Sequence, residues 1–150
     1  MVLLIAEPLR KIWLTAEPDS KIVYGDRIGN EGRFLVNVRE MQGLFHLDVA
    51  TGDTGLDREV KGGYCGDLLS DVMANAEEGQ VWLTVQSHQN IVAVAVLREI
   101  AAIILVNGRL PDEDTEAKAK EEGLPILLSS STAYQLAGQI YGAGFGKTEE

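Results

Sequence analysis

Between residues 47 and 142, short apolar runs alternate with segments of helical periodicity, and this alternation narrows the fold more than any other feature. After a short run at Leu47–Thr51, three runs are almost uninterrupted by polar residues: Val81–Val85, Ala101–Val106 and Ile126–Leu128. Such runs are typical of strands buried on both faces. Strands joined by helical crossovers pair in parallel. The sequence therefore predicts an α/β fold, a three-layer sandwich with a mostly parallel sheet between helix layers.

Helical segments occupy the intervals between these runs. Asp67–Ala76 has its apolar residues on one face. Asp112–Glu122 ends at Gly123, a residue type favoured just after a helix. Ser131 or Thr132 is a suitable cap for the last helix, whose side chains predict one apolar face. The apolar positions of that helix are Ala133, Leu136, Ala137, Ile140 and Tyr141.

One segment, Ile91–Leu97, is ambiguous because its β-branched residues favour a strand by propensity alone. We predict a helix, since the segment lies between two apolar strands that need a crossover to pair in parallel. Ser87 offers an N-cap for it. Apolar residues on all sides indicate that this helix is buried.

The first 34 residues differ from the remainder in charge and pattern. They carry five basic and five acidic residues, so the rest of the chain holds the whole formal charge of −10. We interpret this β-rich extension either as an added β-hairpin element or as an introduced sequence foreign to the domain. The chain then divides into residues 1–34, a domain at 35–142 and a flexible tail at 143–150. The strands predicted in the extension are Val2–Ile5, Lys11–Thr15, Lys21–Tyr24 and Arg33–Val36.

Composition excludes several classes of function. With 13 basic against 23 acidic residues, the chain repels nucleic acids and anionic membranes, so neither is an expected partner. The longest apolar stretch, Ile91–Val106, contains Arg98 and Glu99 and is too short to span a bilayer. Met1–Ile5 lacks the positive charge that begins a signal peptide, so we expect a cytoplasmic location. One cysteine and two histidines are too few for a standard structural zinc site, and no metal is expected.

Polar segments are predicted to follow neighbouring strands: Gly62–Asp67, Gln86–Asn90, Asn107–Arg109 and Ser129–Thr132. Because the carboxyl ends of parallel strands share one edge of a sheet, we expect these loops to converge there. Most also lead into helix N-termini, which attract anions. The same residue types serve as caps and turns, so pure capping is the alternative interpretation. The candidate ligand-binding residues are Gly63, Tyr64, Cys65, Asp67, Gln86, Ser87, His88, Asn90, Asn107, Gly108, Arg109, Ser130, Ser131 and Thr132.

Three of these side chains each have two interpretations. Cys65 is either a nucleophile near a helix start, with His88 or His46 as base, or a small hydrophobe. His88 either contacts a ligand or bonds to the backbone at a helix start. Arg109 either holds an anion through two hydrogen bonds or is an exposed turn residue. We assign no catalytic residue and leave the cofactor unknown.

The C-terminal sequence YGAGFGKT, residues 141–148, is similar to the phosphate loop GxxxxGK[ST] but has Tyr141 at the first glycine. That loop must follow a strand and open a helix. Here a helix precedes the sequence, so we interpret it as a glycine-rich helix end.

Three segments together carry a family resemblance: GGYCGDLLSDVM at 62–73, TVQSHQNIVAVA at 84–95 and ILVNGRLPDEDT at 104–115. Over residues 35–142 the chain resembles the small stand-alone DRTGG-domain proteins, which are similar to the N-terminal domain of HPr kinase/phosphorylase. At the family's TGG turn this chain has Val106-Asn107-Gly108, so a threonine and a glycine are replaced. The kinase activity is not carried over, because the kinase domain and its phosphate loop are absent from the resemblance.

The resemblance implies a three-layer α/β domain that regulates or senses, of a kind found beside CBS modules and, in stand-alone form, with iron-hydrogenase genes. We therefore expect a non-catalytic regulatory domain that binds a small anionic or nucleotide-like ligand at the carboxyl edge of the sheet. The alternatives are a protein-interaction adaptor without a small ligand and a thiol- or phosphoryl-transfer enzyme. A homodimer and a regulatory protein partner are further expectations.

Overall fold

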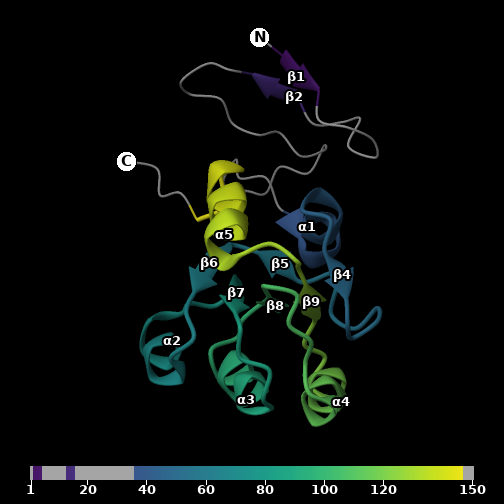
Figure 1. Ribbon diagram of the computed structural model, residues 1–150, viewed down its shortest axis with the longest axis vertical. Coiled ribbons are helices and arrows are strands. Elements are labelled where there is room, and N and C mark those ends of the chain that lie inside the picture. Colours follow the sequence, from purple (N-terminus) through teal and green to yellow (C-terminus); the bar gives the residue numbers. More distant parts are fainter. Residues whose placement is uncertain (1, 5–12, 16–35, 147–150) are drawn as a thin grey trace.

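The central element of the fold is a five-stranded sheet with the strand order β4-β9-β8-β7-β6 (Figure 1). The structure, a computed structural model, describes residues 2–4, 13–15 and 36–146. Strands β6 to β9 are parallel, and β4 joins β9 antiparallel at one edge. The elements are β1 (Val2–Leu4), β2 (Trp13–Thr15), β3 (Val36–Asn37), α1 (Val38–Leu44), β4 (Asp48–Val49), β5 (Glu59–Val60), β6 (Gly62–Cys65), α2 (Leu69–Asn75), β7 (Gln80–Thr84), α3 (Asn90–Leu97), β8 (Ala102–Leu105), α4 (Glu113–Glu121), β9 (Ile126–Leu128) and α5 (Ala133–Gly142).

Helices cover both faces of this sheet, which confirms the predicted three-layer α/β fold. In Figure 1, α1 and α5 lie on one side, and α2, α3 and α4 lie on the other. Alternate residues of each strand enter opposite cores, as the pleat requires. Val81 and Leu83 of β7 pack toward the first layer, and Trp82 packs toward the second. The central strands are thus buried on both faces, as their continuous apolar runs predict.

The predicted helix ends are confirmed where capping groups mark them. The Thr132 side chain accepts a hydrogen bond from the Gln135 backbone, and the Gln135 side chain accepts one from the Thr132 backbone. Asn37 and Glu40 form the same reciprocal pair at the start of α1. Gly123, after α4, has a φ of 65°, a conformation that glycine adopts without steric cost.

The ambiguous segment is a helix, α3, as the crossover argument predicts. Its predicted cap is wrong: the N-cap is Gln89, whose side chain makes no capping hydrogen bond, and His88 rather than Ser87 accepts an N–H of the first turn. Ser87 lies one turn earlier, where its carbonyl oxygen accepts hydrogen bonds from the Asp112 N–H (3.1 Å) and the Thr115 hydroxyl (2.7 Å). Ser87 therefore holds the start of α4 rather than that of α3.

The segment GGYC is not the loop that its two glycines indicate. It is strand β6, the edge strand parallel to β7. A Cβ on Gly62 would lie 3.3 Å from the Gly146 Cα, so the chain after α5 passes too close for most side chains. The two-stranded sheet of β3 and β5 is a second element that the sequence pattern does not reveal.

The ends of the chain are described only in part. Strands β1 and β2 pair antiparallel, at positions predicted to be strands. The predicted strand Lys21–Tyr24 and residues 33–35 lie outside the described residues. Beyond α5, the Phe145 ring packs against Phe45 with 6.1 Å between centroids, so this part of the expected tail contacts the core. The domain boundaries at residues 34 and 142 stay predictions.

Among the described residues, the helices are all too short or too polar to cross a bilayer.

Candidate functional site

The four polar segments of the sequence analysis converge at one edge of the sheet. Each one follows, or ends, one of the parallel strands β6 to β9, whose carboxyl ends lie side by side. We call this edge the carboxyl rim and define it as residues 65–67, 85–90, 106–109 and 129–132. The predicted convergence is therefore confirmed, and the chemistry of the rim follows from which of its groups are already bonded.

The β6 and β7 ends of the rim are joined through Asp67. Its Oδ1 accepts hydrogen bonds from the Thr84 hydroxyl (2.8 Å) and the Val85 N–H (2.9 Å). The Gln86 side-chain amide donates to the Asp67 carbonyl at 3.2 Å. Next to this pair, the Trp82 indole N–H donates to the Gly66 carbonyl at 2.8 Å. The Asp67 carboxylate thus closes a structural turn.

The β8 and β9 ends are joined through the backbone. The N–H groups of Asn107 and Gly108 donate to the carbonyls of Ser131 and Ser129, both at 2.9 Å. Asn107 and Gly108 have φ values of 57° and 66°, a left-handed turn that asparagine and glycine adopt readily. Ser129 also uses its hydroxyl to accept from the Ser131 N–H at 3.1 Å. Many polar groups of the rim are therefore already used in hydrogen bonds that form the turns.

The side chains that remain available are few and exposed. The His88 Nδ1 accepts the Asn90 N–H at 3.3 Å, which leaves its other ring nitrogen open. Within the described part of the chain, the Arg109 guanidinium and the Asn107 side-chain amide make no hydrogen bond. A guanidinium, an amide and an imidazole on neighbouring rim loops are hydrogen-bond donors that suit an anion. Twelve of the fourteen predicted residues lie in the rim, and the prediction is wrong for Gly63 and Tyr64, which lie inside strand β6 before its carboxyl end. The twelve are Cys65 at the end of β6, Asp67 in the next turn, Gln86, Ser87 and His88 in the loop before α3, Asn90 in its first turn, Asn107, Gly108 and Arg109 after β8, and Ser130, Ser131 and Thr132 before α5.

The surroundings of Tyr64 and Cys65 in β6 do not favour nucleophilic chemistry by the Cys65 thiol. The Tyr64 hydroxyl bonds the Asp71 carboxylate of α2, and this hydrogen bond raises the pKa of Tyr64. Cys65 is exposed, and partial desolvation and then the nearby Asp67 charge raise the pKa of its thiol. Neither His46 nor His88 hydrogen-bonds Cys65. A nucleophilic cysteine has a lowered pKa, and both causes act on the pKa of Cys65 in the opposite direction. Among the described residues, no three His, Cys, Asp or Glu side chains gather into a metal-holding group.

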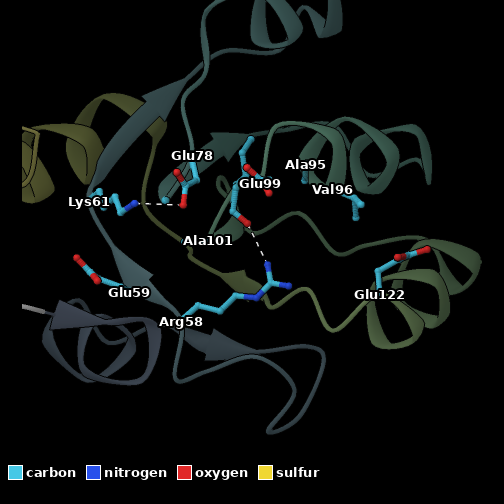
Figure 2. A pocket seen from close by; sticks show the side chains of 11 residues that line it. Arg58, Glu59, Lys61, Glu78, Ala95, Val96, Glu99, Ala101 and Glu122 are labelled. Carbon is cyan, nitrogen blue, oxygen red and sulfur yellow. Dashed lines mark hydrogen bonds and ion pairs between the residues drawn. The ribbon is translucent and has the colours of Figure 1, made fainter.

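Two hollows lie largely away from the rim, and the sequence analysis missed both. One, of about 380 Å³, opens at the opposite edge of the sheet, where β7 and β8 begin (Figure 2). The other, of about 490 Å³, lies between α3 and α4 and touches the rim at Gln89 and Asn90. The apolar residues on all sides of α3 predicted a buried helix, and this prediction is wrong for its outer side, where Ala93, Val96 and Leu97 are exposed.

The first hollow is lined largely by charged residues. Figure 2 shows the Lys61 ammonium paired with Glu78 at 3.2 Å, and the Arg58 guanidinium donating to a carbonyl beside Ala101. That acceptor is the Ile100 carbonyl, at 3.1 Å. Glu59 and Glu99 also line the hollow and make no ion pair with any described residue, and Figure 2 shows the Glu59 carboxylate pointing away from Arg58 and Glu78. Lys61 is thus paired with a carboxylate, whereas Arg58 is bonded to a neutral carbonyl and keeps its positive charge beside the unpaired Glu59 and Glu99.

Comparison with known proteins shows a fold likeness only. No protein-family model matches the sequence, and no curated protein matches it. A solved structure of the CBS and DRTGG domains of the regulatory region of Clostridium perfringens pyrophosphatase, complexed with its activator diadenosine tetraphosphate, is similar in fold. The TM-score is 0.55 at 12% sequence identity, and the likeness covers 67% of this chain and 43% of that chain. This chain thus spans less than half of that structure, and its fold is related to that of a regulatory region containing a DRTGG domain.

Proposed function

We propose that the protein is a non-catalytic regulatory domain that binds a small anionic ligand, nucleotide-like in its phosphates, at the carboxyl rim. The observation that carries this proposal is the convergence of four polar segments at one edge of a parallel sheet. Ligands of open α/β sheets bind at this edge. The site would consist of the twelve candidate residues that lie in the rim, with Arg109 as its cation.

Two further observations support an anionic ligand. The guanidinium of Arg109 and the side chains of His88 and Asn107 are exposed donors on neighbouring loops. The structurally similar regulatory region carries a nucleotide activator, although the low identity transfers only the fold. A ligand with two or more phosphates would engage more than one loop, and this is how a small domain reaches useful affinity.

The test is a thermal-shift and calorimetric titration with AMP, ATP, pyrophosphate and diadenosine tetraphosphate. A ligand at one hundred times its Kd stabilises the folded state by about 2.7 kcal/mol, which raises the Tm by several degrees. Arg109→Gln is expected to weaken binding at least tenfold. Arg39→Gln is the matched control, because Arg39 is also exposed and pairs with Asp53 and Asp57 away from the rim. Absence of any shift, or equal loss in both variants, would overturn the proposal.

A second candidate function is a protein-interaction adaptor without a small ligand. The observation that favours it is the exposed apolar surface of α3, where Val96 is 42% and Leu97 67% exposed. A homodimer is expected under either function, and light scattering over a concentration series tests it. The thiol-enzyme alternative is disfavoured by the raised pKa of Cys65.

A further inference from the structure

Tyr134 is the most exposed large apolar residue of the described part of the chain, and it stands next to the carboxyl rim. It lies in the first turn of α5, two positions after Thr132, and is 90% exposed. Among the described residues its ring makes no aromatic contact and its hydroxyl no hydrogen bond. A helical side chain leans toward the N-terminus of its helix and covers the preceding turn. For Tyr134 that turn is the rim segment at residues 129–132.

The hydrogen-bond donors of the rim are tied to the same segment. The N–H groups of Asn107 and Gly108 donate to the carbonyls of Ser131 and Ser129, both at 2.9 Å. These two bonds hold the loop that ends at Arg109 against the segment that leads into α5. Ser131 and Tyr134 are three positions apart, so their Cα atoms are separated by at most about 11 Å. A ligand of nucleotide size can therefore reach both the Tyr134 ring and the donors of this loop.

Charge favours the α5 side of the rim for an anion. Within the rim the formal charges are those of Arg109 and Asp67, and the Asp67 carboxylate already accepts two hydrogen bonds. The first turn of α4, which follows Arg109 along the chain, contains three acidic residues, whereas the first turn of α5 contains none. A phosphate held by Arg109 is thus repelled on the α4 side and meets no such carboxylate at the start of α5.

We propose that the anionic ligand of the rim is a nucleoside polyphosphate, whose base stacks on the Tyr134 ring while its phosphates meet Arg109 and Asn107. The inference rests on the proposed function and deepens it, because the rim donors alone select an anion and not a base. A tyrosine ring offers a flat apolar face, and every base can stack on such a face. The reciprocal cap of Thr132 and Gln135 fixes the start of α5, so the ring stands on an ordered turn.

The test compares ATP with tripolyphosphate by isothermal titration calorimetry. Tripolyphosphate carries at least as much negative charge as ATP, so it should bind at least as tightly if the base makes no contact. We expect ATP to bind at least about fivefold more tightly, as one stacked base implies. Tyr134→Ala should abolish this difference and leave tripolyphosphate affinity within about twofold. Tyr134→Phe is the matched control, because it keeps the ring and should keep the difference.

Arg109→Gln separates the two parts of the site. It should weaken both ligands to the same extent, because it removes a phosphate contact and leaves the ring. If tripolyphosphate binds and ATP binds no more tightly, or if Tyr134→Ala preserves the difference or weakens both ligands equally, the inference is overturned while the proposed function stands. If neither ligand binds, the proposed function fails and the inference fails with it. Circular dichroism checks that each variant remains folded.

Discussion

The two edges of the central sheet differ in how their polar groups are used. At the carboxyl rim, Asp67 and the turn at Asn107 are hydrogen-bonded to neighbouring segments. At the opposite edge, which we call the amino edge, Glu59 and Glu99 line a hollow without an ion-pair partner among the described residues. An abundance of polar residues in the sequence therefore marks where turns are built. Available surface depends instead on how the helices pack.

The largest expected effect comes from breaking the bonded network of the rim. Asp67→Ala removes the acceptor for the Val85 N–H and for the hydroxyl of Thr84, which is buried. An unsatisfied buried donor costs about 1–3 kcal/mol, so we expect the free energy of unfolding to fall by about 2 kcal/mol. Urea denaturation measures this change.

Asp67→Asn is the control, because it retains the Oδ1 acceptor and should lose less than half as much stability. If Asp67→Ala were as stable as the native protein, the rim turn would not depend on this carboxylate. The carboxylate of Asp67 would then be available for the ligand contact that the proposed site assigns to it.

A smaller effect on stability is expected when a residue with positive φ is replaced by glycine, and we compare one such position at each edge. Glu99 follows α3 with a φ of 53°, and Asn107 lies in the rim turn with a φ of 57°. Glutamate in this left-handed region is strained, whereas asparagine tolerates it. Glu99→Gly is expected to raise the free energy of unfolding by about 0.5–1 kcal/mol, and Asn107→Gly by less than about 0.3 kcal/mol.

Thermal and urea denaturation of both variants measure the difference. Glu99→Gln retains the Cβ while removing the charge, so it should give no stabilisation. A gain in Glu99→Gln would show that charge rather than backbone conformation sets the stability of the amino edge. Equal gains at the two positions would show that asparagine is as strained at position 107 as glutamate is at position 99.

The smallest effect is on the reactivity of Cys65. Because the pKa of its thiol is raised, the thiolate fraction at pH 8 is lower than that of an ordinary thiol. Alkylation by iodoacetamide should therefore be slower than that of a free peptide thiol, and its rate should reach a plateau at higher pH. Asp67→Asn should partly restore the rate by removing the neighbouring charge. Faster alkylation than the peptide would contradict this and return Cys65 to the list of candidate nucleophiles.

Much of the fold follows from apolar periodicity. β7, β8 and β9 are nearly continuous apolar runs, and the chain direction that parallel pairing demands was enough to place a helix at Ile91–Leu97 against its β propensity. The sequence pattern did not predict β6, because two consecutive glycines, Gly62 and Gly63, are typical of a turn. Position 62 needs a residue without a side chain because Gly146 packs close to it, and this contact joins residues far apart in the sequence.

The candidate site was predictable to a different degree. That four loops meet is a consequence of parallel topology and could be derived from the order of the elements. Which groups remain free could not, because Asp67 and Ser87 are engaged by residues 17 or more positions away. The hollow between α3 and α4 was also hidden, since the exposure of Val96 and Leu97 depends on where α4 packs against α3.

Helix α3 begins in the rim loop at Asn90 and ends beside the amino edge, where the Arg98 guanidinium is bonded to the Ala76 carbonyl. A two-turn helix is stiff along its axis, since bending it means breaking backbone hydrogen bonds. If the loop at Gln86–Asn90 were displaced, α3 would move with it as a rigid unit, and Val96 and Leu97 at its other end would be displaced as well.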